Sequence, residues 1–160
     1  MAPAAYLEAQ PGEKVLDLCA APGGKSTQIA AAMQGEGLLV SNEIHPTRAK
    51  ILAENIERMG IKNALVTNET PQRLADIFEE YFDRIMVDAP CSGEGMFRKN
   101  EDACSEWSLE NVEICAARQA EILECAASML KRGGRLVRES RFYSASSFIW
   151  HRRECRQSRA

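Results

Sequence analysis

Near its N-terminus the chain reads Lys14-Val15-Leu16-Asp17-Leu18-Cys19-Ala20-Ala21-Pro22-Gly23-Gly24-Lys25. The apolar first half of this run predicts a short buried strand. The proline and the glycine pair predict a loop, and the residues from Lys25 to Met33 predict a helix that ends at Gly35 and Gly37. A strand that passes through a short loop into a helix is the repeating unit of an α/β protein.

The same alternation of strand and helix continues along the chain. Further strands are predicted at 38–42, 64–67, 85–87 and 135–137, and further helices at 46–59, 71–80 and, after an N-cap at Ser108, up to Leu130. Strict alternation implies a parallel sheet with right-handed crossovers. The sequence therefore predicts a doubly wound, Rossmann-like α/β domain over residues 1–137.

This pattern breaks off after Val137. Arg138-Glu139-Ser140-Arg141 places charges where a central strand should continue, which is costly unless the charges find partners. Residues 138–160 hold six arginines and two glutamates, whereas the whole chain has a net charge of −3. We expect this basic tail to be disordered and the C-terminal strands of the sheet to be incomplete. Our hypothesis is that a disrupted reading frame or a truncated gene causes the loss of the pattern after Val137.

The composition is that of a single globular domain without a membrane span. The chain has 160 residues, of which 45% are hydrophobic and 27% are charged. It has no apolar run of about 18 residues, and its first residues do not form a secretory signal. The six cysteines include no C-x-x-C pair, which gives no sign of a metal site. We expect a cytoplasmic protein with no metal and no obligate protein partner.

A second polar motif directly follows the strand predicted at 85–87, and it reads Asp88-Ala89-Pro90-Cys91-Ser92-Gly93. In open α/β sheets, ligands bind beyond the carboxyl ends of the strands. A thiol at that place can act as a nucleophile if its pKa is lowered. On the residues alone, Cys91 is either such a nucleophile or a residue that only ends the strand.

Three classes of ligand are considered for the glycine loop: a dinucleotide, a nucleotide bound by a P-loop and S-adenosylmethionine. A dinucleotide fingerprint requires G-x-G-x-x-G, and only the pair Gly23-Gly24 is present. A P-loop requires a glycine where Cys19 stands, which disfavours a nucleotide hydrolase although Asp88 could imitate a magnesium-binding acid. S-adenosylmethionine suits a short glycine loop, and Glu43 after the second strand can accept hydrogen bonds from ribose hydroxyls. The alternative is that the glycines only cap the helix and that Glu43 is a solvated turn residue.

On Asp17–Thr27, Glu43 and Asp88–Gly95 the chain closely resembles the Nol–Nop–Sun family of RNA cytosine-5 methyltransferases. Within that family it looks most like the bacterial RsmF-type ribosomal RNA enzymes. The resemblance covers residues 1 to about 137, and its most specific motif is Asp88 to Lys99. It implies an S-adenosylmethionine-dependent methyltransferase with RNA, ribosomal RNA in particular, as its partner.

The resemblance also implies roles for individual residues. Glu43 would bind the ribose, Thr70 stands where the family has an acidic residue near the adenine, and Asp88 would lie between the cofactor and the target base. The methionine part of the cofactor would be held by Cys19, Ala20, Ala21, Pro22, Gly23, Gly24 and Lys25.

The family uses two cysteines, and only one of them is matched here. A thiolate adds to carbon 6 of cytosine so that carbon 5 can accept the methyl group. The resemblance gives Cys91 the role of resolving this adduct, with Asp88 as its companion in the site. The attacking cysteine would stand at position 141, where the chain has Arg141, a side chain without a nucleophilic lone pair. The resemblance thus leaves either a methyltransferase domain or an inactive remnant that retains cofactor and RNA binding.

Family members also carry an RNA-binding N-terminal region, and RsmF-type members a further C-terminal domain; we expect this chain to lack both.

Overall fold

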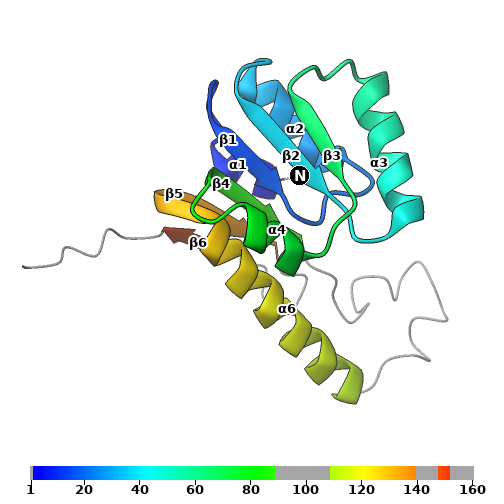
Figure 1. Cartoon of the computed structure of the whole chain (residues 1–160), viewed down its shortest axis with the longest axis vertical. Helices are drawn as coiled ribbons and strands as arrows, with labels where there is room; N and C mark the ends of the chain where they lie inside the picture. The colour runs from blue at the N-terminus through cyan, green and yellow to red at the C-terminus, as the bar shows by residue number, and fades with distance from the viewer. Residues whose placement is uncertain (1, 89–108, 140–147, 152–160) are drawn as a thin grey trace, which may run out of the picture.

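A computed structural model describes residues 2–88, 109–139 and 148–151 (Figure 1). Within these residues one sheet is formed, with the strand order β3-β2-β1-β4-β5-β6. The strands are β1 Lys14–Asp17, β2 Leu38–Asn42, β3 Ala64–Thr67, β4 Phe82–Val87, β5 Leu130–Arg138 and β6 Phe148–His151. The helices are α1 Ala2–Leu7, α2 Gly24–Met33, α3 Pro46–Arg58, α4 Pro71–Ile77 and α6 Leu109–Met129. Strands β1 to β5 run parallel, which confirms the predicted doubly wound α/β fold.

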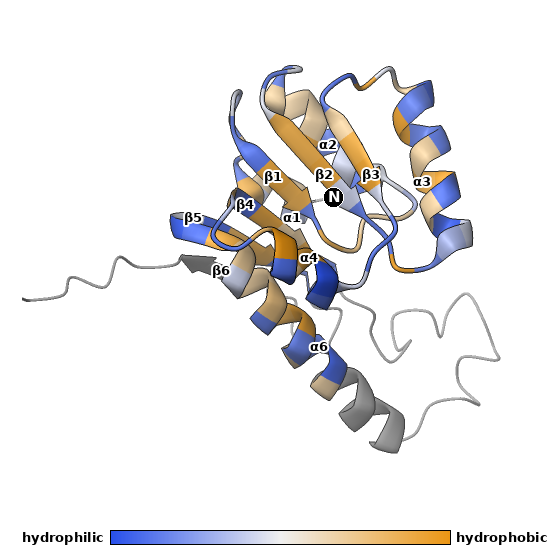
Figure 2. Cartoon of the chain, viewed as in Figure 1, coloured by the Kyte–Doolittle hydropathy of each residue, from blue (hydrophilic) through white to orange (hydrophobic). Residues whose placement is uncertain are grey.

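Helices cover both faces of the sheet because the side chains of each strand alternate between the two faces. On one face, Val15 of β1 packs in a core cluster with residues of α1 and α2. On the other face, Leu16 packs in a cluster with residues of α4 and α6. Helix α3 packs through Leu52 and Ile56 against the loop after β1 and against β3. Figure 2 shows the result, with the central strands coloured as hydrophobic and the outer sides of the helices as mostly hydrophilic.

The order of the strands determines where a ligand can bind. From β1 the chain moves outward to β2 and β3, and it then returns to place β4 on the other side of β1. The helices that follow β1 and β4 therefore leave the sheet on opposite faces, which opens a crevice at the carboxyl ends of these two strands. Asp17 lies opposite Met86 in the register, so the loop after β1 and Asp88 after β4 emerge side by side.

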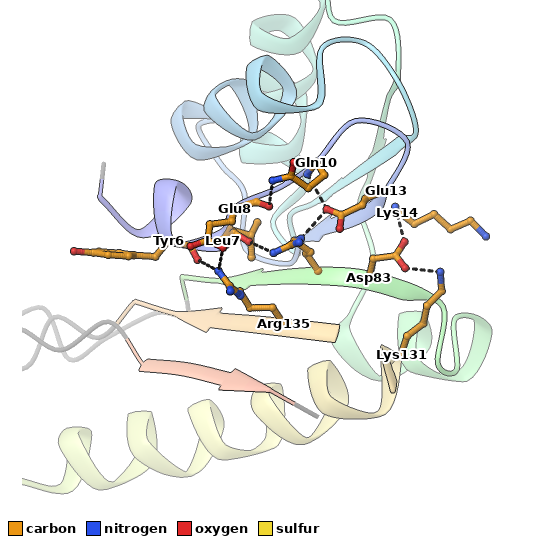
Figure 3. Close-up of polar contacts among 10 residues, drawn as sticks. Tyr6, Leu7, Glu8, Gln10, Glu13, Lys14, Asp83, Lys131 and Arg135 are labelled. Carbon is orange, nitrogen blue, oxygen red and sulfur yellow. Dashed lines mark hydrogen bonds and ion pairs between the residues drawn. The ribbon is translucent and has the colours of Figure 1, made fainter. Parts of the chain in front are cut away.

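Helix α1 was not predicted from the sequence, and long-range contacts explain why. Two arginines of neighbouring strands hold its last turn. Arg84 of β4 donates to the carbonyl of Leu7 at 2.7 Å, and Arg135 of β5 donates to the carbonyl of Tyr6 at 3.1 Å (Figure 3). A six-residue helix is too short to be stable alone, so the sheet is required to hold it.

The start of β5 differs from its predicted position. The strand begins at Leu130, not at Arg135, but its register against β4 jumps from Leu130 directly to Arg135. Residues 131–134 therefore bulge out of the ladder. Helix α4 ends at Ile77, three residues earlier than predicted.

The charges at the end of β5 have partners. Strand β5 runs through Arg138, whose guanidinium donates to the side-chain carbonyl of Gln119 on α6. Strand β6 pairs antiparallel with β5, Arg138 lying opposite Phe148. Four residues of the predicted tail thus form a strand, while residues 140–147 and 152–160 lie outside the described residues. Disorder of the tail as a whole stays a prediction. Among the helices described, none has the length together with the apolar composition that a membrane crossing requires.

Two glycines of the turn before β2 provide a test of the packing. Gly35 and Gly37 both have a positive φ, +79° and +81°, so alanine is strained at either position. A Cβ on Gly37 would lie 2.2 Å from the carbonyl oxygen of Glu13, whereas one on Gly35 would have no neighbour within 4 Å. We expect Gly37→Ala to lower the free energy of unfolding by at least about 2 kcal/mol more than Gly35→Ala does, as measured by urea denaturation. Equal losses would show that the turn before β2 adapts freely.

Candidate functional site

A cleft of about 520 Å³ lies at the carboxyl ends of β1, β2 and β4. Its walls come from the loops after these strands and from α3, α4 and α6. Of the residues that the sequence assigns to the site, Cys19, Ala21, Glu43 and Asp88 line the cleft. Its size is in the range of small-molecule and cofactor sites.

Glu43 presents a fixed carboxylate to the cleft. It directly follows β2 and is only 3% exposed. Its Oε1 accepts a hydrogen bond from the backbone N–H of His45 at 3.0 Å, and its Oε2 lies 3.5 Å from the guanidinium of Arg48. The side chain is therefore held in one orientation and can accept further hydrogen bonds from a ligand hydroxyl.

Asn42 is a structural residue of the site that the sequence analysis did not identify. Its amide nitrogen donates to the carbonyls of Leu18 at 3.3 Å and Glu69 at 3.0 Å. Its amide oxygen accepts from the Thr67 hydroxyl at 2.9 Å and the Glu69 N–H at 3.1 Å. One buried side chain thus joins the ends of β1, β2 and β3, which are remote in sequence. An asparagine at the end of a strand is a common residue, and no local pattern distinguishes this one.

The glycine loop after β1 is fastened to α3. Arg48 donates to the carbonyl of Ala21 at 3.1 Å, and Asn55 donates to the carbonyl of Pro22 at 2.8 Å. Gly23 has a φ of +110°, and a Cβ there would lie 3.1 Å from a methyl carbon of Leu52. Ala20 is buried against the same helix. These residues therefore position the loop, and Ala20, Pro22, Gly23 and Gly24 are not among those that line the cleft.

Lys25 joins two carboxylates beside the cleft. Its ammonium lies 2.6 Å from Oδ2 of Asp88 and 2.8 Å from Oε2 of Glu139. Burial would lower the pKa of Lys25, but the hydrogen bonds and charges of Asp88 and Glu139 outweigh burial and hold the pKa above its ordinary value. Lys25 is therefore a permanent cation. Glu139 was assigned to the aberrant tail, and only the pairing of β5 with β4 shows its place in the site.

The cysteine that lines the cleft is not a nucleophile. Burial, together with the negative charges of Asp17, Glu43 and Asp88, raises the pKa of Cys19 to about 12. Its thiol stays protonated at neutral pH, and it is the thiolate that reacts. Cys91 and Arg141 lie outside the described residues, so the roles predicted for these positions stay predictions.

Thr70 acts as a helix cap in this structure. Its hydroxyl accepts a hydrogen bond from the backbone N–H of Arg73 at 3.3 Å, at the start of α4. The next two residues, Pro71 and Gln72, line the cleft and Thr70 does not. A contact between Thr70 and the adenine stays a prediction.

Asp17 is a buried carboxyl beneath the glycine loop. The hydroxyl of Ser26 donates to its Oδ2 at 2.7 Å, and the hydroxyl of Ser41 donates to Ser26 at 3.1 Å. Burial raises the pKa of Asp17 to about 6, although the hydrogen bond from Ser26 and the charge of Lys25 act in the opposite direction. The loop is thus built over a carboxyl that is costly to ionise.

Comparison with known proteins identifies the family. Residues 4–149 match the family described as 16S rRNA methyltransferase RsmB/F. The chain belongs to this family. The resemblance inferred from the sequence motifs is thereby confirmed.

Curated members and solved structures extend this result. The chain is 49% identical over 125 residues to ribosomal RNA small subunit methyltransferase F of Vibrio vulnificus, covering 78% of this chain and 26% of that protein. It therefore spans about a quarter of the length of the curated relatives it matches. A methyltransferase homolog protein from Pyrococcus horikoshii is 30% identical with a TM-score of 0.73, over 85% of this chain and 42% of that one.

NSun6 from Pyrococcus horikoshii, solved with the S-adenosylmethionine analogue SFG, is 29% identical with a TM-score of 0.74. The match covers 85% of this chain and 34% of that one. Solved methyltransferases of less than 25% identity, some of them described as S-adenosylmethionine-dependent, share the fold.

The cofactor of the RsmB/F family, S-adenosylmethionine, fits the residues of the cleft. The buried carboxylate of Glu43 suits ribose hydroxyls. Ile44 and Pro71, which also line the cleft, offer apolar surface to a purine. Asp88, which also lines the cleft, supplies negative charge that suits a sulfonium.

The raised pKa of Asp17 predicts a pH-dependent stability. Because its folded pKa of about 6 lies above the ordinary 3.8, ionisation of Asp17 costs stability as the pH rises through 6. This cost is absent below about pH 4 and complete above about pH 7. Asparagine does not ionise. We expect the free energy of unfolding of Asp17→Asn, relative to wild type, to rise by about 2 to 3 kcal/mol between pH 4 and pH 7.5 in urea titrations. A constant difference would show that Asp17 ionises normally.

Removing the charge of Glu43 tests its role as a ligand group. Glu43→Gln keeps the size of the side chain but weakens hydrogen bonds from ligand hydroxyls, since bonds to charged groups are the stronger ones. We expect the Kd for S-adenosylmethionine, measured by calorimetry, to rise about tenfold. The control Glu54→Gln changes an exposed glutamate of α3 outside the cleft and should leave the Kd unchanged. Similar Kd values in all three proteins would exclude Glu43 from the binding site.

Proposed function

We propose that this chain binds S-adenosylmethionine in the cleft and serves as the cofactor-binding domain of an RNA cytosine-5 methyltransferase that acts on ribosomal RNA in the cytoplasm. The observation that supports the proposal is that Glu43 and Asp88 line one cleft at the switch point of the sheet, with Lys25 paired to Asp88 beside it. Glu43, directly after β2, stands where ribose hydroxyls need an acceptor, and Asp88 directly follows β4, on the other side of β1.

The proposed chemistry divides the work between cofactor and protein. S-adenosylmethionine supplies an electrophilic methyl group. Asp88, held beside the ammonium of Lys25, offers carboxylate oxygen to the exocyclic amino group of a cytosine, which is a hydrogen-bond donor. The base has to leave any stacked helix before it can reach this carboxylate. We assign Asp88 to base and cofactor positioning, and Cys91 to resolution of the covalent adduct.

Small-subunit ribosomal RNA is the proposed substrate. The curated relatives carry the name ribosomal RNA small subunit methyltransferase F. The chain spans 26% of the length of each of these relatives.

A second candidate is a domain that binds the cofactor and RNA but does not transfer the methyl group. The observation that favours it is Arg141, which stands where the family resemblance requires the attacking cysteine. Cys19 cannot replace that cysteine, because its pKa of about 12 keeps the thiol protonated.

Restoring the missing thiol distinguishes the two candidates. The full chain and its Arg141→Cys variant are incubated with labelled S-adenosylmethionine and small-subunit ribosomal RNA, and the digested RNA is analysed for 5-methylcytidine. We expect Arg141→Cys to transfer at least about tenfold more label than wild type, because covalent activation of the base requires a thiolate. Arg141→Ser, which removes the arginine without adding a thiol, should behave as wild type.

Each outcome decides between the candidates. Transfer by wild type at the level of Arg141→Cys would reject the inactive domain and show that another group attacks the base. Cofactor binding without transfer in any of the three proteins would support the inactive domain. Failure of all three to bind the cofactor would reject both candidates.

A further inference from the structure

Three charged side chains from three different elements meet beside the cleft. Lys25 comes from the first turn of α2, Asp88 directly follows β4, and Glu139 directly follows β5. The ammonium of Lys25 lies 2.6 Å from Asp88 and 2.8 Å from Glu139. The side chains are between 18% and 23% exposed, so water screens them only partly.

The backbone fixes Glu139 in this position. Its N–H donates to the carbonyl of Val87 at 2.9 Å, which continues the pairing of β5 with β4 beyond Arg138. Val87 directly precedes Asp88. The glutamate is therefore placed next to Asp88 by the sheet itself, and the ion pair with Lys25 does not depend on a chance orientation of a long surface side chain.

The charges of this cluster do not cancel. A pair of Lys25 and Asp88 alone would be neutral, but Glu139 adds a second carboxylate to the same ammonium. Asp17, buried beneath the loop, adds further negative charge near Lys25 when it is ionised. The cationic Arg48 lies against Glu43 on another wall of the cleft. Among Lys25, Asp88, Glu139 and Asp17 the carboxylates outnumber the single ammonium, so these four side chains contribute negative charge to the edge beside Asp88.

We propose that Glu139 is a positioning residue that, through Lys25, keeps this edge negative and makes the cleft prefer S-adenosylmethionine to S-adenosylhomocysteine. The inference rests on the cofactor assignment made above. Methyl transfer converts a sulfonium, which carries one positive charge, into a neutral thioether, and the methyl group leaves with its bond to sulfur broken. A negative edge attracts the first form and not the second. Glu139 thus favours loading of the substrate form and release of the product form.

Calorimetry on the full chain tests this inference. The Kd values of S-adenosylmethionine and S-adenosylhomocysteine are measured for wild type and Glu139→Gln at pH 8, where Asp17, with a pKa of about 6, is ionised in both proteins. We expect the preference for S-adenosylmethionine, expressed as the ratio of the two Kd values, to fall about five- to tenfold in Glu139→Gln. Sinefungin carries an amine where the cofactor carries the sulfonium. Its Kd should therefore change in Glu139→Gln in the same direction as the Kd of S-adenosylmethionine.

Two control variants separate charge from structure. Glu139→Asp retains the carboxylate and should keep most of the preference. Glu8→Gln removes one carboxylate from the ion pair with Arg135, 2.6 Å apart, which involves the amino-terminal helix and not the cleft (Figure 3). It should leave the preference unchanged.

Three results would overturn the inference. An unchanged ratio of the two Kd values in Glu139→Gln would show that the charge of Glu139 does not affect ligand binding. Equal weakening of both ligands would show that Glu139 supports only the structure of the site. Failure of the wild-type chain to bind any of the ligands would overturn the cofactor assignment as well, whereas binding with an unchanged ratio leaves that assignment intact.

Discussion

The pairing of β1 with β4 is the constraint on which the site depends. The two strands are far apart in the sequence, yet Val15, Leu16 and Asp17 lie opposite Arg84, Ile85 and Met86 in a parallel register. A slip by one residue would exchange the faces on which Leu16 and Asp17 lie and would bury a carboxylate among the apolar residues of α6. In the observed register the loop after β1 and Asp88 emerge together, and Lys25 at the start of α2 can reach across to β4.

Local patterns were sufficient to predict most of the fold. The bounds of β2 and β3 agree with the predicted strands, because short apolar runs between glycine and polar residues have little freedom to be anything else. The predictions failed where distant residues decide the structure. Helix α1 depends on Arg84 and Arg135, and the start of β5 depends on which residues face β4. Neither dependence can be read from neighbouring residues.

The residues of the candidate site also fall into two groups, those that local sequence patterns predict and those that depend on distant contacts. Glu43 and Asp88 could be found from the sequence because each directly follows a strand. Asn42 and Glu139 could not, since their roles are hydrogen bonds and ion pairs to residues at least 24 positions away. The buried Asp17 belongs to a recognisable motif, but only its burial and its contact with Ser26 show that its ionisation is costly.

The end of β5 changes the interpretation of the charged segment after Val137. Unpartnered charges at this position would oppose a continued strand. Arg138 instead donates to the side-chain carbonyl of Gln119, and Glu139 pairs with Lys25, so both charged groups have polar partners in the domain. The first residues of the segment therefore lie beside the cleft, whatever the origin of the residues that follow. Cofactor binding and methyl transfer then depend on different parts of the chain. The proposed binding rests on residues up to Asp88, on α6 and on Glu139, whereas the proposed transfer rests on positions 91 and 141.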